Sequence, residues 1–388
     1  MGQTYWKDFK HKVDRGREGL NHWIPFPFDR FSKHVGITKR MYHLIGGDPG
    51  TGKSAFTHLC YITQPYNWWK NRKDETDMKL RIILRSMERS KEYTIAKWVC
   101  WRIYFKYGVL LDVNDILSYG DSRLGDEEYE MVCETRDYFE QMQEHVEIID
   151  GLDNPTGIWK HLRGWAHQNG DTFRLKDGSQ PQKYIERDGG EWINIRSLPP
   201  DVEIDNRFER IYVPDDEDLL TIFIIDHIGK VRRERGYTKK ENLDKMSEYI
   251  AVARDRFGFI PVVVSQFNRS LSDSTRRSRL SVAPEKQDFK GTGNTYEDCD
   301  VAMGLFNPHE YQMEEFPDHN GLPSYAIQNF VNQDGFNRFR SLHVLKNTYG
   351  IDNFDIGLNF IGEIGHFREL PRPENMTRDL YQHYTNVG

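Results

Sequence analysis

The chain has 388 residues, enough for one large domain or two domains of ordinary size. Hydrophobic residues make up 37% and charged residues 29%, which is typical of a soluble globular protein. The net charge of −7 excludes a uniformly basic nucleic-acid-binding protein, so any such contact must come from local basic patches. No run approaches the 18 apolar residues of a membrane-spanning helix, so no membrane partner is expected. The 4 cysteines are widely spaced, which gives no support for a zinc site or disulfides and fits a reducing compartment.

Residues 1 to about 20 are expected to form a short amphipathic helix. Tyr5, Trp6, Phe9 and Val13 recur at near-helical spacing among charged residues. Such a helix could cap its own domain or dock on a neighbouring subunit, and the sequence slightly favours the cap. We therefore assign residues 1–35 to an N-terminal helical linker or cap.

Residues 41–60 carry the most specific motif of the chain. Gly47, Gly52, Lys53 and Ser54 match the phosphate-loop pattern G-x-x-x-x-G-K-[ST], with an apolar strand before the loop and a helix-like run after it. In such a loop, backbone N–H groups and the positive end of the following helix point at an anion. Lys53 supplies a charge for the terminal phosphates, and the Ser54 hydroxyl can bind Mg²⁺. The predicted nucleotide-binding residues are Gly47, Asp48, Pro49, Gly50, Thr51, Gly52, Lys53, Ser54 and Ala55.

Three polar residues each follow an apolar strand. Asp226 ends the run 219–226, where it could support the metal ion or simply cap the next loop. Glu88 follows the strand around 81–85 and could activate the attacking water, or could be a helix-start Glu favoured by the dipole. Gln266 ends the strand that begins at 259 and could sense the terminal phosphate or face solvent. We predict Glu88, Lys53, Asp226 and Gln266 as the catalytic set.

Basic segments follow two of these strands. Residues 229–240 carry a net charge of about +5, and residues 268–290 about +3, in an otherwise acidic chain. The alternatives are contact with a phosphate backbone and an ordinary solvated charged surface. The predicted DNA-binding residues are Arg232, Arg233, Arg269, Arg276, Arg277 and Arg279.

Strands and helices alternate along most of the chain, and several strands read as fully buried. This pattern predicts a doubly wound α/β domain. Residues 171–215 interrupt this alternation of strands and helices. They contain several turn-forming sequences, separated by short stretches in which apolar and polar residues alternate, which predicts an inserted β-hairpin or small β-rich subdomain. The predicted organisation is a linker or cap at 1–35, an ATPase domain at 36–370 with this insert, and a tail at 371–388.

From about Gly19 to Leu370, apart from the insert, the chain resembles the RecA-type ATPase domain of DnaB-like replicative helicases. The resemblance rests on the phosphate loop, Ser86-Met87-Glu88, IFIIDHIGKV, VVVSQFNRSL and DFKGTGNTYEDCDVAMGLF, in family order and spacing. It implies a RecA-like fold with a mostly parallel central sheet. It also implies that Glu88 is the water-activating base, that Asp226 supports the metal, and that Asn268 and Arg269 begin a DNA-facing loop.

The sequence departs from the family pattern at two places. The family's late K-x-R-x-G supplies a lysine and an arginine to the neighbouring subunit's nucleotide, and here Lys346 and Gly350 fit but Thr348 replaces the arginine. His366 also stands where an arginine is usual. Arg338, Arg340 or Arg368 could substitute for the missing arginine, or hydrolysis between subunits could be weak. Lys346 and Arg340 are the predicted trans-subunit residues. The family's N-terminal helical domain is not found in this sequence.

Together these features predict an ATP- and Mg²⁺-dependent helicase or translocase that moves on single-stranded DNA during replication. The resemblance implies a homo-hexamer, possible contact with primase or other replication proteins, and a cytoplasmic location in a bacterial cell or phage-infected host. The alternative is a RecA-like ATPase that binds DNA without unwinding it, such as a loader, recombinase or packaging accessory.

Overall fold

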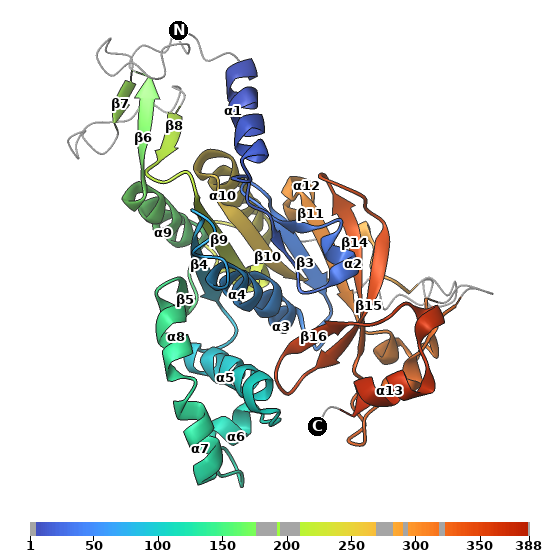
Figure 1. Ribbon diagram of the computed structural model, residues 1–388. Coiled ribbons are helices and arrows are strands. Elements are labelled where there is room, and N and C mark those ends of the chain that lie inside the picture. Colours follow the sequence, from blue (N-terminus) through green and yellow to red (C-terminus); the bar gives the residue numbers. More distant parts are fainter. Residues whose placement is uncertain are drawn as a thin grey trace.

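The computed structural model describes residues 5–175, 192–194, 210–268, 282–289, 294–317 and 323–386. In this part of the chain the main sheet has nine strands in the order β16-β15-β14-β11-β3-β10-β9-β4-β5 (Figure 1). Its parallel strands are β3 (His43–Gly47), β4 (Lys79–Ser86), β5 (Val146–Asp150), β9 (Leu219–Asp226), β10 (Ile260–Gln266) and β11 (Val301–Phe306). The antiparallel strands are β14 (Phe339–Asn347), β15 (Phe354–Ile361) and β16 (His366–Glu369). The predicted mostly parallel central sheet is confirmed.

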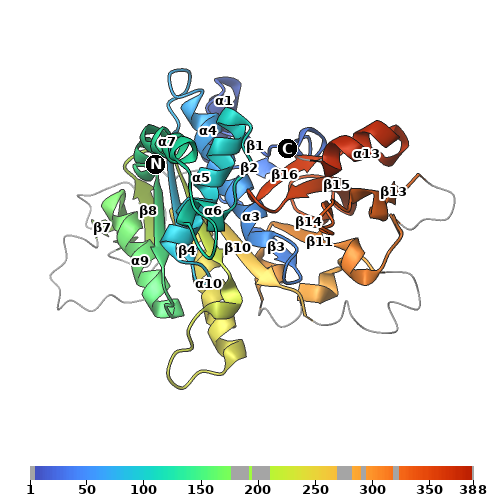
Figure 2. The ribbon, with the colours of Figure 1, turned by 90° about the horizontal axis from the view of Figure 1, so that it is seen from below.

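Helices cover both faces of this sheet (Figure 2). One face carries α3 (Lys53–His58), the π-helical turn η1 (Leu59–Thr63), α4 (Gln64–Lys70), α5 (Lys91–Tyr107) and α8 (Arg136–Gln143). The other carries α9 (Pro155–Gln168) and α10 (Lys239–Phe257). Each face has its own apolar core, because residues such as Leu44 and Ile45 alternate between the two sides of the buried strands.

Local signals set the limits of the longer helices. Thr238 and Glu241 form a reciprocal capping box at the start of α10, and Gly258 ends it with φ 72°. The Ser90 side chain caps the start of α5, and Gly108 ends it with φ 75°. Residues 126–143 form two helices, α7 (Asp126–Cys133) and α8.

The remaining elements are short. They are β1 (Ile24–Pro25), α2 (Asp29–Ser32), β2 (Gly36–Ile37), α6 (Val113–Leu117), η4 (Ile228–Lys230), η6 (Lys286–Phe289), α12 (Thr295–Asp298), η7 (Pro308–Tyr311), β12 (Glu315–Phe316), β13 (Tyr325–Ala326), η8 (Ile327–Phe330) and η9 (Pro373–Asn375). The described part of the insert forms a small antiparallel sheet of β6 (Gly170–Leu175), β7 (Trp192–Asn194) and β8 (Arg210–Pro214), as predicted.

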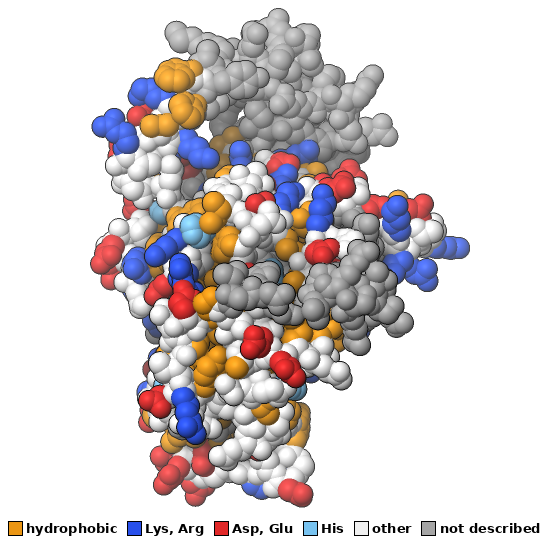
Figure 3. Space-filling model, turned by 90° about the vertical axis from the view of Figure 1, so that its right-hand side faces the viewer, with side chains coloured by type: hydrophobic (Ala, Val, Ile, Leu, Met, Phe, Trp, Pro, Cys, Tyr) orange, Lys and Arg blue, Asp and Glu red, His pale blue; other side chains and the backbone are white. Residues whose placement is uncertain are grey.

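The two ends of the chain behave differently. Helix α1 (Tyr5–Arg17) has the predicted helical form, but it does not bury its apolar face on its own domain, as the cap interpretation required. Trp6 is 68% and Phe9 57% exposed, and the apolar side chains of α1 stand out beside basic ones at the upper left of Figure 3. The C-terminal tail is an ordered helix, α13 (Arg378–Thr385), held on the domain by Tyr381 and Thr385. No helix in the described residues is long and apolar enough to cross a membrane.

Candidate nucleotide-hydrolysis site

The loop between β3 and α3 has the tight geometry that its sequence predicts. Thr51 Oγ1 and Lys53 Nζ both donate hydrogen bonds to the Asp48 carbonyl oxygen, at 2.8 and 2.6 Å. Gly52 is the N-cap residue before α3 and has φ 96°, and an added Cβ would lie 2.9 Å from Phe367 and 3.0 Å from Phe360. Only glycine combines this left-handed backbone with so little space. The loop therefore curls so that its backbone N–H groups can point at a bound anion inside it.

Lys53 lies among carboxylates at this centre. Burial is the largest influence and lowers the pKa of Lys53, while Asp226, Asp48 and Glu88 oppose it by Coulomb attraction. The ammonium group is mostly removed from solvent, which strengthens its attraction for a phosphate compared with an exposed lysine. This arrangement suits the predicted contact with terminal phosphates.

Asp226 and Ser54 lie together at the carboxyl end of β9. Asp226 is 4% exposed, and its Oδ1 has no hydrogen-bond partner. Burial raises the pKa of Asp226 to about 6, a hydrogen bond from Ser54 lowers it, and Glu88 raises it further. A buried carboxylate oxygen without a partner is costly unless a cation offsets its charge. This pair fits Mg²⁺, which takes one or two protein oxygens and completes its shell with water and phosphate.

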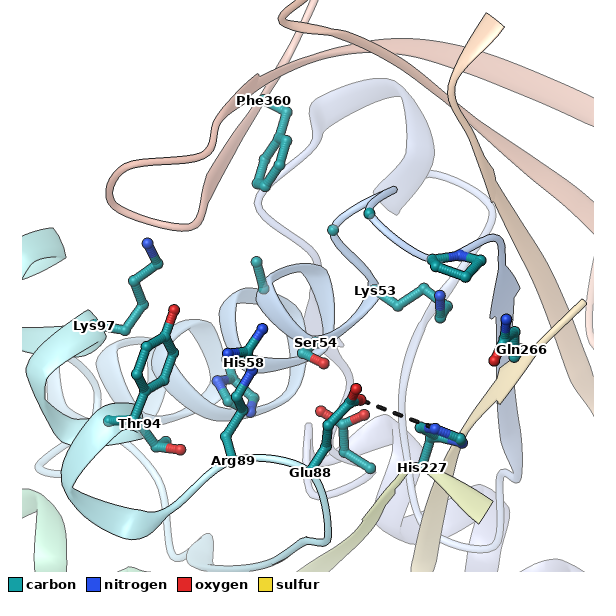
Figure 4. Close-up of a pocket in the computed structure, with 16 residues that line it drawn as sticks. Lys53, Ser54, His58, Glu88, Arg89, Thr94, Lys97, His227, Gln266 and Phe360 are labelled. Carbon is teal, nitrogen blue, oxygen red and sulfur yellow. Dashed lines mark ion pairs between the residues drawn. The ribbon is translucent and has the colours of Figure 1, made fainter. Parts of the chain in front are cut away.

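The other predicted catalytic residues open into the same pocket (Figure 4). Glu88 follows β4, and its side chain is 49% exposed. Gln266 ends β10 directly beside Gly47 of β3, with which it pairs in the parallel ladder. The pocket thus collects Lys53, Ser54, Glu88, Asp226 and Gln266 from four segments that are far apart in sequence.

Several residues of this pocket were not predicted from the sequence: His58, Arg89, Tyr93, Thr94, Lys97, His227 and Phe360. Lys97 of α5 donates to the carbonyl oxygens of Gly362 and Glu363, at 2.8 and 2.7 Å, and so ties α5 to the turn after β15. Arg89 lies over the Tyr93 ring, 4.7 Å from its centroid. His227 follows Asp226 in the sequence, and this was the one sequence signal that could have placed it in the pocket. Nothing local marks Phe360, because it comes from β15, near the other end of the chain from the phosphate loop.

The two predicted trans-subunit residues lie in different settings. Arg340 is 6% exposed and donates to the carbonyl oxygens of Thr51, Asn337 and Phe339 of its own chain, and its trans-subunit role stays a prediction. Lys346 pairs with Ala302, which pairs with Leu44 near the start of β3. Lys346 therefore lies toward the end of the parallel strands that is opposite the phosphate loop. Its ammonium group contacts the carbonyl oxygens of Tyr296 and Glu297.

The predicted DNA-binding residues are only partly described. Arg232 and Arg233 are exposed, just beyond the carboxyl end of β9. Arg269, Arg276, Arg277 and Arg279 lie outside the described residues. The two ends of that segment meet, because the Asn268 backbone N–H donates to the Asp288 carbonyl oxygen at 2.9 Å, two residues after Gln266.

No protein-family model matches this chain, and no curated protein matches its sequence. Solved structures resemble its fold. One, an ATPase domain, gives a TM-score of 0.61 at 15% identity, over 95% of this chain and 100% of that one. A DnaB-like replicative helicase, solved with attention to its interactions with primase, gives 0.59 at 15% identity, over 93% of this chain and 67% of that one. The chain therefore has the RecA-like fold of a DnaB-like helicase ATPase domain, and the predicted fold class is confirmed.

Proposed function

We propose that this protein hydrolyses ATP to move along single-stranded DNA, as a DnaB-like helicase or translocase. One observation carries the proposal: Lys53, Ser54, Glu88, Asp226 and Gln266 line one pocket at the carboxyl ends of β3, β4, β9 and β10. A phosphate loop by itself indicates only that the site binds a nucleotide. Hydrolysis also needs a base for the attacking water and a ligand for the metal ion. The half-exposed Glu88 and the buried Asp226 supply these two groups.

Each residue has a role in this proposal. The loop N–H groups and Lys53 bind the phosphates, and Ser54 with Asp226 would hold Mg²⁺. That ion, when bound, offsets the charge that develops on the transferred phosphoryl group. Glu88 orients the attacking water and accepts its proton, since its carboxylate opens into the pocket. Gln266 contacts the terminal phosphate and links its presence to the segment that begins at Asn268.

The DNA and assembly parts of the proposal rest on two placements. The exposed Arg232 and Arg233, and the segment closed by Asn268 and Asp288, both leave the nucleotide side of the sheet. Lys346 lies far from its own phosphate loop, so a role at a nucleotide requires another subunit. This supports an assembly of more than one subunit. The proposal takes the ring-shaped homo-hexamer, and primase or another replication protein as a further partner, from the resemblance to DnaB-like helicases.

The test compares ATP hydrolysis by wild type, Lys53→Ala and Glu88→Gln, with and without single-stranded DNA. We expect DNA to stimulate the wild type, and both variants to lose most of their turnover while keeping the native fold. Glu88→Gln is expected to retain ATP binding, because the amide keeps the shape of the carboxylate but is a very poor base. Undiminished hydrolysis by Lys53→Ala would refute the proposal.

A second function has one specific observation in its favour. Thr348 occupies the position of the family's trans-acting arginine, and its hydroxyl donates to the Asp300 carbonyl oxygen instead. A RecA-like ATPase that binds DNA without unwinding it, such as a loader, recombinase or packaging accessory, has less need of that group. Strand displacement on a forked DNA separates the two functions: DNA-stimulated hydrolysis with no displacement at any protein concentration favours the second.

A further inference from the structure

The strand register brings Glu88 and His227 together beside the phosphate loop. In the parallel ladder Ser86 of β4 pairs with Asp226 of β9, and the Met87 N–H donates to the Asp226 carbonyl oxygen at 2.8 Å. Glu88 and His227 follow directly, at the pocket end of these strands. His227 Nε2 lies 3.9 Å from Glu88 Oε2, as the dashed line in Figure 4 marks. His227 is thus the side chain beside the proposed base.

A backbone hydrogen bond fixes the orientation of the His227 ring. The Gly229 N–H donates to His227 Nδ1 at 3.2 Å, so Nδ1 acts as the acceptor. In a neutral imidazole with Nδ1 as acceptor, the proton resides on Nε2. The donor nitrogen is therefore the one that faces Glu88.

The chain leaves space for this ring at Gly229. A Cβ atom added to Gly229 would lie 2.9 Å from Cε1 and 3.0 Å from Nδ1 of His227. Contacts this short require the imidazole to move. Glycine at this position thus leaves the room that the ring occupies.

We propose that His227 is a positioning residue that holds the Glu88 carboxylate in the orientation needed to accept a proton from the attacking water. The inference rests on the proposed ATPase function. The separation of 3.9 Å exceeds a hydrogen bond, and hydrogen bonds between catalytic groups are often long before substrate binds. The half-exposed Glu88 has side-chain freedom to close the gap, whereas the ring is mostly buried and held by the backbone.

The first test compares His227→Leu with His227→Gln. Leucine removes the donor, whereas the glutamine amide can place an N–H near the position of Nε2. We expect His227→Leu to lower kcat for ATP roughly 10- to 100-fold, the scale of a misplaced catalytic group, and His227→Gln to recover part of that loss. The dissociation constant of a fluorescent ATP analogue should stay within about threefold of the wild type, because the phosphates are held elsewhere.

Gly229→Ala provides a test that leaves His227 intact. The added methyl group displaces the ring, so kcat should fall while binding of the analogue persists. Gly164→Ala is the matched control, since its added Cβ meets no heavy atom within 4 Å apart from the adjacent backbone of its own helix, and it should leave kcat unchanged. Circular dichroism and thermal midpoints establish that each variant is folded.

A double-mutant cycle decides whether His227 acts through Glu88. In a Glu88→Gln background, His227→Leu should cause little further loss, because there is no base left to orient. An equal loss in both backgrounds, or an undiminished kcat for His227→Leu, would overturn the inference. In either case a wild-type activity that depends on Lys53 leaves the ATPase proposal standing. Absence of ATPase in the wild type would instead refute that proposal, and this inference with it.

Discussion

Arg340 Nε donates a hydrogen bond of 3.2 Å to the carbonyl oxygen of Thr51, inside the phosphate loop of its own chain. Its Nη1 donates to Asn337 and Phe339 carbonyl oxygens, and the guanidinium lies 5.2 Å from the centroid of the Phe360 ring. Burial lowers the pKa of Arg340 to about 10, although Glu310 opposes that shift. Arg340 is still charged at neutral pH and supports the loop from within its own chain.

Arg340→Met should therefore weaken both the fold and the loop. The substitution leaves buried carbonyl oxygens without a donor, so the free energy of unfolding should fall by about 1–3 kcal/mol. KM for ATP should rise, because the Thr51 segment is no longer held. Urea denaturation and steady-state kinetics measure the two effects. Arg372→Met is the control, since the Arg372 side chain is 67% exposed with one ion pair of 3.9 Å. Unchanged stability of Arg340→Met would contradict this account.

Gly52→Ala should disable the phosphate loop. Alanine is strained at φ 96°, and its methyl group would lie 2.9 Å from Phe367. We expect a stability loss of more than about 1 kcal/mol and a marked loss of ATP affinity. Calorimetric titration with a non-hydrolysable ATP analogue checks the binding. Gly362→Ala, where the added Cβ meets Phe360 at an ordinary 3.6 Å, should bind normally.

Lys346 should act on a neighbour's nucleotide. Lys346 lies toward the end of the parallel strands opposite the phosphate loop. We therefore predict that Lys346→Met lowers ATPase activity without altering the phosphate loop of the same chain. Mixing Lys346→Met with Lys53→Ala should then restore activity above the sum of the separate variants, because some interfaces combine an intact lysine with an intact loop. No recovery on mixing would argue for a role within one chain, or for none.

Buried histidines should make the protein acid-sensitive. Burial lowers the pKa of His43 to about 3, of His58 to about 4 and, with help from Arg368, of His366 to about 3. The unfolded chain takes up these protons near pH 6.5 and the folded chain does not, so stability is full above pH 6.5 and falls as the pH drops toward 4. Each histidine should cost about 1.4 kcal/mol between about pH 7.5 and pH 5.5.

His43→Phe isolates one of these contributions. Neither ring nitrogen of His43 has a hydrogen-bond partner, so phenylalanine loses no contact of that kind. Denaturation at about pH 7.5 and about pH 5.5 should show a smaller drop for this variant than for the wild type. His383→Phe, at an exposed position, should keep the wild-type drop. An identical pH dependence for His43→Phe would show that His43 does not bind a proton on unfolding.

The sequence by itself determined the local parts of this protein. Spacing alone identified the phosphate loop, and the apolar runs identified β4, β9 and β10 with a polar residue at or after each end. These features depend on a few neighbouring residues, whose side-chain types report directly on backbone conformation and burial. The resemblance in motif order added the RecA-like fold, which the solved structures confirm.

Only the tertiary structure decided which of these parts are neighbours. The strand order places β10 between β3 and β9, and β4 beside β9, which is what brings His227 to Glu88. Only the tertiary structure shows that Arg340 contacts its own loop and that α1 leaves Trp6 exposed. A pattern shows which face of an element is apolar. It does not show which distant segment covers that face, because the packing of the whole chain selects the partner.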